Sequence, residues 1–272
     1  MVYYTPVIPF CLSSLNTRNP RNHHISAIFK INNGYIQELS LRKSPMIETC
    51  ERSELKYLIN KIDYLLLDKK LKTVLSCDPH ADSTGYVVKS VYFDDFSDTA
   101  WLDNLIGSGN REKFRIRYYN NDTSFINLEK KVKNLSKGTK QISRLTQDEA
   151  QALIEGRFEV IKSSQDPLLK EFYLKARQRG LRAKVIVAYQ RMPYLYNAGN
   201  VRVTLDSEIR NSMDVRRFFD PDLSLVPQLT QQCLLEVKFD RYLPEIVRHL
   251  IQVPNTIQTA HSKYSLSRLF NT

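Results

Sequence analysis

Charged residues recur at alternate positions in five short stretches of this chain, and this spacing indicates a polar chemistry confined to one side of a sheet. Residues two apart in a β-strand point to the same face, so each stretch would gather its charges on one side. Large apolar residues fill the positions between them and would face a core. The charged positions are Lys113, Arg115 and Arg117; Glu129 and Lys131; Arg191; Arg202; and Glu236 with Lys238, and the apolar ones are Phe114, Ile116, Leu128, Val203, Leu235 and Val237.

One such stretch, residues 113–119 (KFRIRYY), admits three interpretations when taken alone. It could be an edge strand protected by charge, a binder of single-stranded nucleic acid, or part of a phosphate site. The two stretches with glutamate two residues before lysine favour a phosphate site over a nucleic-acid binder. A carboxylate repels nucleic acid, but it can hold Mg²⁺ or Mn²⁺ against phosphate oxygens. Cross-strand pairing of surface charges is the alternative for each stretch singly. Two of them beside three arginine-bearing strands favour a phosphate site.

Arginine at positions 115, 117, 191 and 202 adds to this interpretation. A guanidinium group makes forked contacts to phosphate and stays charged among other cations. Such strands closed into a barrel would line a cationic lumen, suited to a nucleotide triphosphate or a chain of phosphates. Cations in a narrow interior repel one another, so we expect an anionic ligand to stabilise the barrel.

Composition agrees with an anionic partner. The chain has 272 residues, enough for one large domain or two small ones, and 40 Lys and Arg against 29 Asp and Glu give a net charge of +11. No stretch of about 18 apolar residues predicts a membrane span, and the start has no basic region typical of a signal peptide. We therefore expect a cytoplasmic protein. The scattered cysteines predict reduced, buried thiols rather than a disulfide framework, and their spacing indicates no zinc site; they are Cys11, Cys50, Cys77 and Cys233.

The order of elements predicts an α+β fold. We expect an N-terminal extension over residues 1–48, with a hairpin at 25–41, and a second unit over 49–272. Strands are predicted at 51–59, 86–95, 112–119, 124–133, 182–191, 200–206 and 232–240, helices at 60–71, 98–105, from 146, at 166–179 and at 244–251, and a polar tail from 255. Without strand–helix–strand regularity or a glycine-rich phosphate loop, an eight-stranded antiparallel β-barrel with helices packed outside fits better than a Rossmann or P-loop fold.

Eight motifs, taken in order, resemble the polyphosphate polymerase domain of the vacuolar transporter chaperone (VTC) family, a member of the triphosphate tunnel metalloenzymes related to the CYTH proteins. They are RSELKYLI, YVVKSVYFDD, REKFRIRYY, LEKKVK, VAYQRMPY, NVRVTLD, LEVKF and HSKYSLSR, over residues 51–268. The resemblance implies an eight-stranded tunnel that transfers the γ-phosphate of ATP onto a growing polyphosphate chain. It also implies Mn²⁺ or Mg²⁺ as cofactor, and ATP and inorganic polyphosphate as partners.

The resemblance assigns roles to individual residues. The phosphate ligands that it implies for catalysis are Lys56, Arg115, Arg117, Lys131, Arg191 and Arg202. Glu236 would hold the metal, and Ser262 with Lys263 would complete the phosphate site from the tail. The alternation adds Lys113 and Lys238 as phosphate-binding residues and Glu129 as a second metal candidate, because they share the same predicted faces.

Three functions share this tunnel: a polyphosphate polymerase, which we prefer, a triphosphatase of the same class, and a non-catalytic module that binds polyphosphate or nucleotide. Nucleic acid is not an expected partner. No membrane span or inositol-phosphate sensor is recognised, so a membrane partner would be a separate chain. Peripheral attachment to the inner face of the membrane is an alternative to a free cytoplasmic protein.

Overall fold

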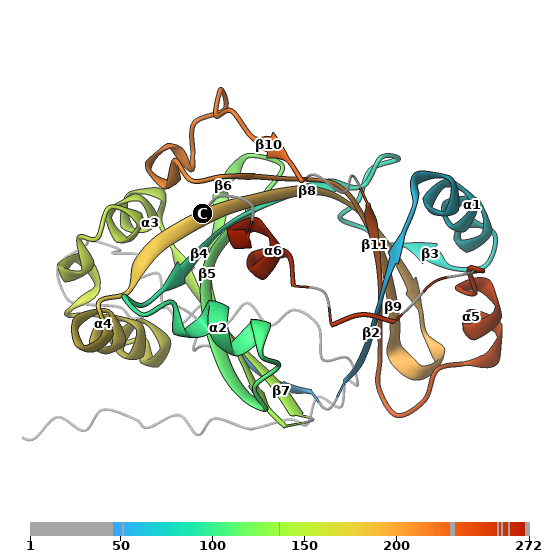
Figure 1. Ribbon diagram of the computed structural model, residues 1–272, viewed down its shortest axis with the longest axis horizontal. Coiled ribbons are helices and arrows are strands. Elements are labelled where there is room, and N and C mark those ends of the chain that lie inside the picture. The colour runs from blue at the N-terminus through green and yellow to red at the C-terminus, as the bar shows by residue number, and fades with distance from the viewer. Residues whose placement is uncertain are drawn as a thin grey trace, which may run out of the picture. The chain divides into compact units, whose positions relative to one another are not determined.

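The computed structural model describes residues 46–50, 52–135, 137–228, 232–254, 256, 258–260 and 262–269 (Figure 1). The expected hairpin at 25–41 lies outside these residues. The part described belongs to one compact unit that extends over residues 43–272. None of its described helices is long and apolar enough to cross a membrane.

An antiparallel sheet of eleven strands forms the frame of this unit. Its main order is β1 (Met46–Cys50), β7 (Lys137–Leu145), β6 (Asp122–Asn134), β5 (Asn110–Tyr119), β4 (Tyr86–Asp94), β8 (Arg182–Tyr196), β9 (Val201–Ser212), β11 (Cys233–Phe239) and β2 (Ser53–Ile59). The short β3 (Ser76–Cys77) pairs with β8, and β10 (Val226–Pro227) pairs with β9. The antiparallel α+β class is thus confirmed. β1 and β2 follow each other in the chain yet end the order on opposite sides.

The sheet is strongly curled (Figure 1). A side-chain contact links its two halves. Lys131 Nζ on β6 lies 3.3 Å from Glu54 Oε2 on β2, although five strands separate them in the sheet order. No pairing among the described residues joins β1 to β2, so the sheet is a curled tunnel wall rather than a ring closed by backbone hydrogen bonds.

The alternate apolar residues of the charged strands form two cores on the outer face, as predicted. Phe114, Ile116 and Leu128 pack beneath α3 (Gln147–Ile154) and α4 (Pro167–Arg179), where Phe172 contacts Phe114 with ring centres 5.1 Å apart. Val203, Leu235 and Val237 pack in a second cluster with residues of α1 (Lys61–Lys72) and α5 (Glu245–Leu250). Because these apolar faces are buried, the charged faces must point into the curl.

The helices on the outer face begin at the capping residues from which the sequence predicts them. The Asn60 side chain accepts a hydrogen bond from Asp63 N at 2.8 Å, and Thr146 and Glu149 form a reciprocal capping box. Asp166 caps α4 ahead of Pro167. Short 3₁₀ turns occupy Phe158–Ile161, Ala198–Asn200 and Val215–Arg217.

The structure corrects the sequence prediction in several places. The short strands β1, β3 and β10 were not predicted, and Cys77 is exposed rather than buried. The strand β7 has no predicted counterpart, because KGTKQISRL carries few β-branched or aromatic residues and two lysines in its first half. The predicted polar tail instead contains α6 (Lys263–Leu269), which lies inside the curl rather than outside it (Figure 1). Its Tyr264 ring stacks on Tyr92 of β4, with centres 5.0 Å apart. Trp101 of α2 (Thr99–Leu105) donates to the Ser265 carbonyl at 3.3 Å, and Arg268 pairs with Asp98.

Gly85 joins the turn after Asp82 to β4 and lies against Arg191 of β8. Its φ is +88°, and a Cβ at this position would come 2.1 Å from the Arg191 carbonyl oxygen. A side chain here would meet backbone that cannot yield without displacing Arg191, whose guanidinium belongs to the inner face.

We therefore expect Gly85→Ala to lower the melting temperature by several degrees, because it adds a backbone clash to the unfavourable left-handed φ. Gly107→Ala is the matched control, since Gly107 has a φ of +72° but nothing within 4 Å of an added Cβ. The control should lose only the conformational term, about 1 kcal/mol. Equal losses in thermal denaturation would show that the contact with Arg191 has no cost.

Candidate active site on the inner face of the sheet

Strand register brings the charged residues together on one surface, which we call the inner face. Residues directly opposite in an antiparallel pair share a face of the sheet. Arg115 lies opposite both Tyr92 and Glu129, and Lys113 lies opposite Lys131. The other opposed pairs are Lys131 with Lys140, Arg191 with Asp206, Arg202 with Lys238, Lys56 with Glu236, and Glu54 with Lys238. Charges from β2, β5, β6, β7, β8, β9 and β11 therefore line one surface.

Glu129 is surrounded by cations. Only 2% of it is exposed, and its Oε2 lies 2.7 Å from Arg115 Nε and 4.0 Å from Arg117 Nη1, while Oε1 lies 3.0 Å from Lys140 Nζ. Burial alone would raise the pKa of Glu129, but Arg115 and Arg117, with Lys140, hold that pKa far below its ordinary value. Glu129 is thus a counter-ion for three cations, which leaves little of its carboxylate for a metal.

Arg115 and Arg117 are also held by neutral side chains that the sequence analysis did not single out. Arg117 donates to Ser90 Oγ at 2.9 Å and to Tyr189 OH at 3.2 Å. Arg115 donates to Tyr92 OH at 3.3 Å. The spacing could have identified Tyr189, since it precedes Arg191 by two residues in the same strand. Fixed in this way, the guanidinium groups need little reorganisation to bind an anion.

A second buried carboxylate, Asp206, anchors the other wall. Arg191 makes two parallel contacts to it, at 2.7 Å from Nε and 2.8 Å from Nη2, and Lys263 Nζ of α6 lies 2.6 Å from its Oδ2. Burial opposes the charge on Asp206, but Arg191 and Lys263 keep its pKa below the ordinary value. Asp206 follows Arg202 by four residues in the same strand, and this spacing could have identified it from the sequence.

Four charges alternate in sign across β2 and β11. Glu236 Oε1 lies 2.7 Å from Lys238 Nζ, and Lys56 Nζ lies 3.4 Å from Glu54 and 3.9 Å from Glu236. Lys238 Nζ is 3.7 Å from Glu54, which Lys131 also reaches from across the curl. Burial would raise the pKa of Glu236, yet Lys238 and Lys56 hold it well below its usual range.

A row of three lysines crosses the opposite wall. Lys113, Lys131 and Lys140 are consecutive cross-strand partners on β5, β6 and β7. Desolvation first, and then the charges of Lys131 and Lys56, hold the pKa of Lys113 well below its ordinary value. Among the described residues, no carboxylate lies within salt-bridge distance of Lys113. Like charges directly opposite one another are destabilising, so an anion bound here would stabilise the row.

The two phosphate ligands expected near the C-terminus take different places: Lys263 lies on the inner face, and Ser262 caps α6. Lys263 Nζ enters the inner face and lies 4.6 Å from the centre of the Tyr189 ring. Ser262 Oγ instead accepts from Ser265 N at 3.4 Å, as a cap at the start of α6. Arg202 turns toward Asp78 and Tyr86, with contacts of 3.0 and 2.9 Å. Lys263 thus joins the charges of the inner face, while the Ser262 hydroxyl serves the helix.

Glu236 shares its sheet position with a polar group that lacks a hydrogen-bond partner among the described residues. Thr204 lies directly opposite Glu236, is 2% exposed, and its hydroxyl has no hydrogen-bond partner among the described residues; the same holds for Arg202 Nε. Mg²⁺ and Mn²⁺ are commonly held by one or two carboxylates together with substrate phosphates. No three His, Cys, Asp or Glu side chains gather as a metal site in the described part of the chain. The donor set fits a metal bound jointly with phosphate.

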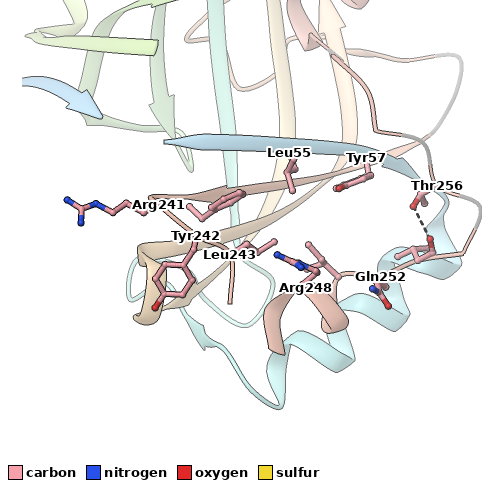
Figure 2. A pocket seen from close by; sticks show the side chains of 11 residues that line it. Leu55, Tyr57, Arg241, Tyr242, Leu243, Arg248, Gln252 and Thr256 are labelled. Carbon is pink, nitrogen blue, oxygen red and sulfur yellow. Dashed lines mark hydrogen bonds between the residues drawn. The ribbon is translucent and has the colours of Figure 1, made fainter. Parts of the chain in front are cut away.

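A separate hollow lies on the outer face behind β2 and β11 (Figure 2). It has a volume of about 570 Å³, and its lining includes Leu55, Tyr57 and Leu243, with Arg248 reaching over it from α5. Leu55 and Tyr57 alternate along β2 with Glu54 and Lys56. The strands therefore separate this largely apolar hollow from the charged inner face.

The lysine row predicts how the stability of the protein and its binding of triphosphate depend on pH. Because Lys113 has a lowered pKa in the folded protein, the unfolded chain binds more protons, and the free energy of unfolding should rise with pH up to about 10.4, the ordinary lysine pKa. Inorganic triphosphate should bind with uptake of a proton. Lys113→Met should raise the melting temperature of the free protein and reduce the stabilisation by triphosphate.

The measurements are melting curves across pH with and without inorganic triphosphate, and calorimetry in buffers of different ionisation enthalpy. Lys162→Met is the control, since the Lys162 side chain is 68% exposed on the surface. A Lys113→Met protein less stable than the parent, with unchanged proton uptake, would contradict repulsion within the row.

Comparison with known proteins identifies the family of the chain. The model of the VTC domain matches residues 51–270. A putative adenylyl cyclase from Hippeastrum with a dominant triphosphatase activity is similar in structure, at 13% identity and a TM-score of 0.48, over 80% of this chain and 95% of that one. A putative adenylate cyclase from Bacillus halodurans has 13% identity and a TM-score of 0.43, over 77% and 94%.

The PH1819 protein from Pyrococcus horikoshii OT3 has 14% identity and a TM-score of 0.42, over 81% of this chain and 99% of that one. No curated protein sequence matches the chain significantly. At these TM-scores the likenesses in structure carry no argument of their own. The family match covers the charged strands and α6 alike, in agreement with the expected resemblance. The chain belongs to the VTC domain family, which places it among the enzymes that process polyphosphate or triphosphate.

Proposed function

We propose that the protein is a polyphosphate polymerase that transfers the γ-phosphate of ATP onto a growing polyphosphate chain along the inner face. The observation that carries this proposal is the lysine row of Lys113, Lys131 and Lys140. Lys131 and Lys140 each pair with one carboxylate, whereas Lys113 has no acid partner among the described residues. A cation in this position is costly unless a phosphate binds beside it. The family match supports an enzyme that acts on phosphates.

The length of the cationic surface favours a chain over a single triphosphate. On β5, inner-face cations occupy Arg117, Arg115 and Lys113 in succession, a run of about 13 Å at 3.3 Å per residue. Lys131 and Lys140 extend it sideways at the Lys113 level. A triphosphate held by the arginines would leave the lysine row for further phosphates, which a polymer needs and a hydrolase does not.

In the proposed reaction, Arg115, Arg117 and Arg191 bind the triphosphate, and Lys263 approaches from α6. A terminal oxygen of the polyphosphate attacks the γ-phosphorus, and the bond from that phosphorus to the β–γ bridging oxygen breaks. ADP leaves with the electron pair of that bond. Charge spreads over the γ-phosphoryl oxygens in the transition state, where fixed guanidinium groups stabilise it without reorganisation.

Mn²⁺ or Mg²⁺, held by Glu236 and Glu54 with the Thr204 hydroxyl beside them, would neutralise phosphate oxygens during transfer. Lys56 and Lys238, which neutralise these carboxylates in the free protein, would then be available to the substrate. Glu129 is assigned a different role from the one expected from sequence. It holds Arg115 and Arg117 in place as their counter-ion.

Incubation of the pure protein with γ-labelled ATP and Mn²⁺ or Mg²⁺, followed by gel separation, tests the function. We expect the label in long polyphosphate. Label in free phosphate alone would identify a triphosphatase, and label that stays in ATP bound to the protein would identify a binding module. Each outcome leaves the family assignment in place.

Glu236→Gln should reduce turnover at least tenfold, about 1.4 kcal/mol, because it keeps the size of the side chain and removes the charge that attracts the metal. The added stabilisation that Mn²⁺ gives the triphosphate-bound protein in melting curves should shrink as well. Glu159→Gln is the control, since the Glu159 side chain is exposed on the surface.

If Glu236→Gln kept full turnover over a metal titration, Glu236 would not be a metal ligand. Loss of turnover with an unchanged metal-dependent melting shift would assign Glu236 to the placement of Lys56 and Lys238 instead.

A further inference from the structure

An aromatic group ends the inner face beyond the arginines of β5. Tyr86 on β4 lies opposite Arg191 of the inner face, and Tyr119 on β5 and Phe125 on β6 adjoin Tyr118 and Ile126 of the outer core. All three rings therefore lie on the inner face. The ring centres of Tyr86 and Tyr119 are 5.6 Å apart, and those of Tyr119 and Phe125 are 6.5 Å apart. Neither the lysine row nor the transfer of phosphate uses these rings.

Phe125 carries a flat cation on its ring. Cζ of Arg144 lies 3.4 Å from the centre of the Phe125 ring, while 46% of Phe125 remains exposed. The guanidinium is fixed by a contact of 3.2 Å to the Ser124 carbonyl and one of 3.5 Å to Asn127 Oδ1. The stacked pair is therefore an ordered planar surface that stays open to solvent.

This surface adjoins the arginines of the phosphate site. Arg117, Asn127 and Arg144 are consecutive cross-strand partners on β5, β6 and β7. Tyr119 follows Arg117 by two residues, and Phe125 precedes Asn127 by two. A register irregularity here places Tyr119 opposite Asp122, so the two rings lie roughly 7 Å beyond the arginine level without being direct cross-strand partners. A ribose can span such an interval between a triphosphate on Arg117 and a base beside the rings.

We propose that Phe125 and Arg144, with Tyr119 beside them, form a stacking platform for the base of the nucleotide substrate. Aromatic rings and guanidinium planes both stack on nucleobases, and stacking accepts any base because each presents a π-face. The buried amide of Asn127 lies at the inner edge of the platform and can hydrogen-bond a base edge. This inference rests on the proposed function, since it assigns a binding site to the base of ATP, the proposed substrate.

The platform also explains why a nucleotide and a polyphosphate chain need not compete for the same length of the inner face. A chain of phosphates offers nothing to stack, whereas the lysine row offers nothing to a base. Nucleotide and polymer would thus be sorted toward opposite ends of the β5 strand, with their reacting phosphates between them.

The test compares ATP with inorganic triphosphate. Calorimetric titration of the full chain with each ligand, in Mg²⁺, gives two dissociation constants for the unmodified protein and for each variant. Phe125→Ala should weaken ATP binding at least fivefold and change triphosphate binding by less than about twofold. Phe125→Trp should restore ATP binding, because the larger ring still stacks.

Phe96→Ala is the matched control, since Phe96 is 92% exposed and lies beyond the opposite end of β4. It should change neither constant, and the melting temperature of each variant verifies its fold. Equal weakening of both ligands by Phe125→Ala, or no weakening of either, would overturn the platform while the phosphate site stands. An unmodified protein that binds neither ligand would overturn the platform and the proposed function together.

Discussion

The structure depends on the concentration of positive charge on the concave side of one sheet, with too few acids to neutralise it everywhere. Where acids are present they are buried and contacted by several cations at once, as Glu129 and Asp206 show. Such contacts lose much of their energy to desolvation. Their main effect is to fix guanidinium groups in position. At Lys113, where no acid partner is present among the described residues, burial and the charges of neighbouring cations lower the pKa of the ammonium group.

Burial of apolar side chains on the outer face provides the free energy that offsets the repulsion among the inner-face charges. Two apolar clusters, one under α3 and α4 and one under α1 and α5, bury the alternate residues of the same strands that carry the charges. Because side chains alternate strictly between faces, a register slip of one residue would exchange Phe114 with Arg115 and bury the cation. The core therefore fixes the position of every inner-face charge.

Much of this was predictable from the sequence, because period-two alternation is a local signal. The outer cores and the inner-face positions of Arg115, Lys131, Arg191 and Glu236 follow from it. The starts of the capped helices follow from a different local signal, the N-cap residues. Lys140 was missed, because β7 lacks the composition of a strand and is defined by its partner β6. The place of α6 inside the curl was also missed, because contacts such as Tyr264 with Tyr92 join residues far apart in the chain.

The distribution of acids also decides between two roles that a sequence cannot separate. Glu129 and Glu236 occupy equivalent E-x-K motifs, yet Glu129 contacts Arg115, Arg117 and Lys140, whereas Glu236 contacts flexible lysines and faces the unpaired Thr204 hydroxyl. An ammonium on a long stem can turn away to a phosphate at little cost, while a guanidinium held by several partners cannot. We therefore propose that Glu236, and not Glu129, exchanges its partners for a metal when substrate binds. In this proposal the same motif is an exchangeable site on one wall and a fixed counter-ion on the other.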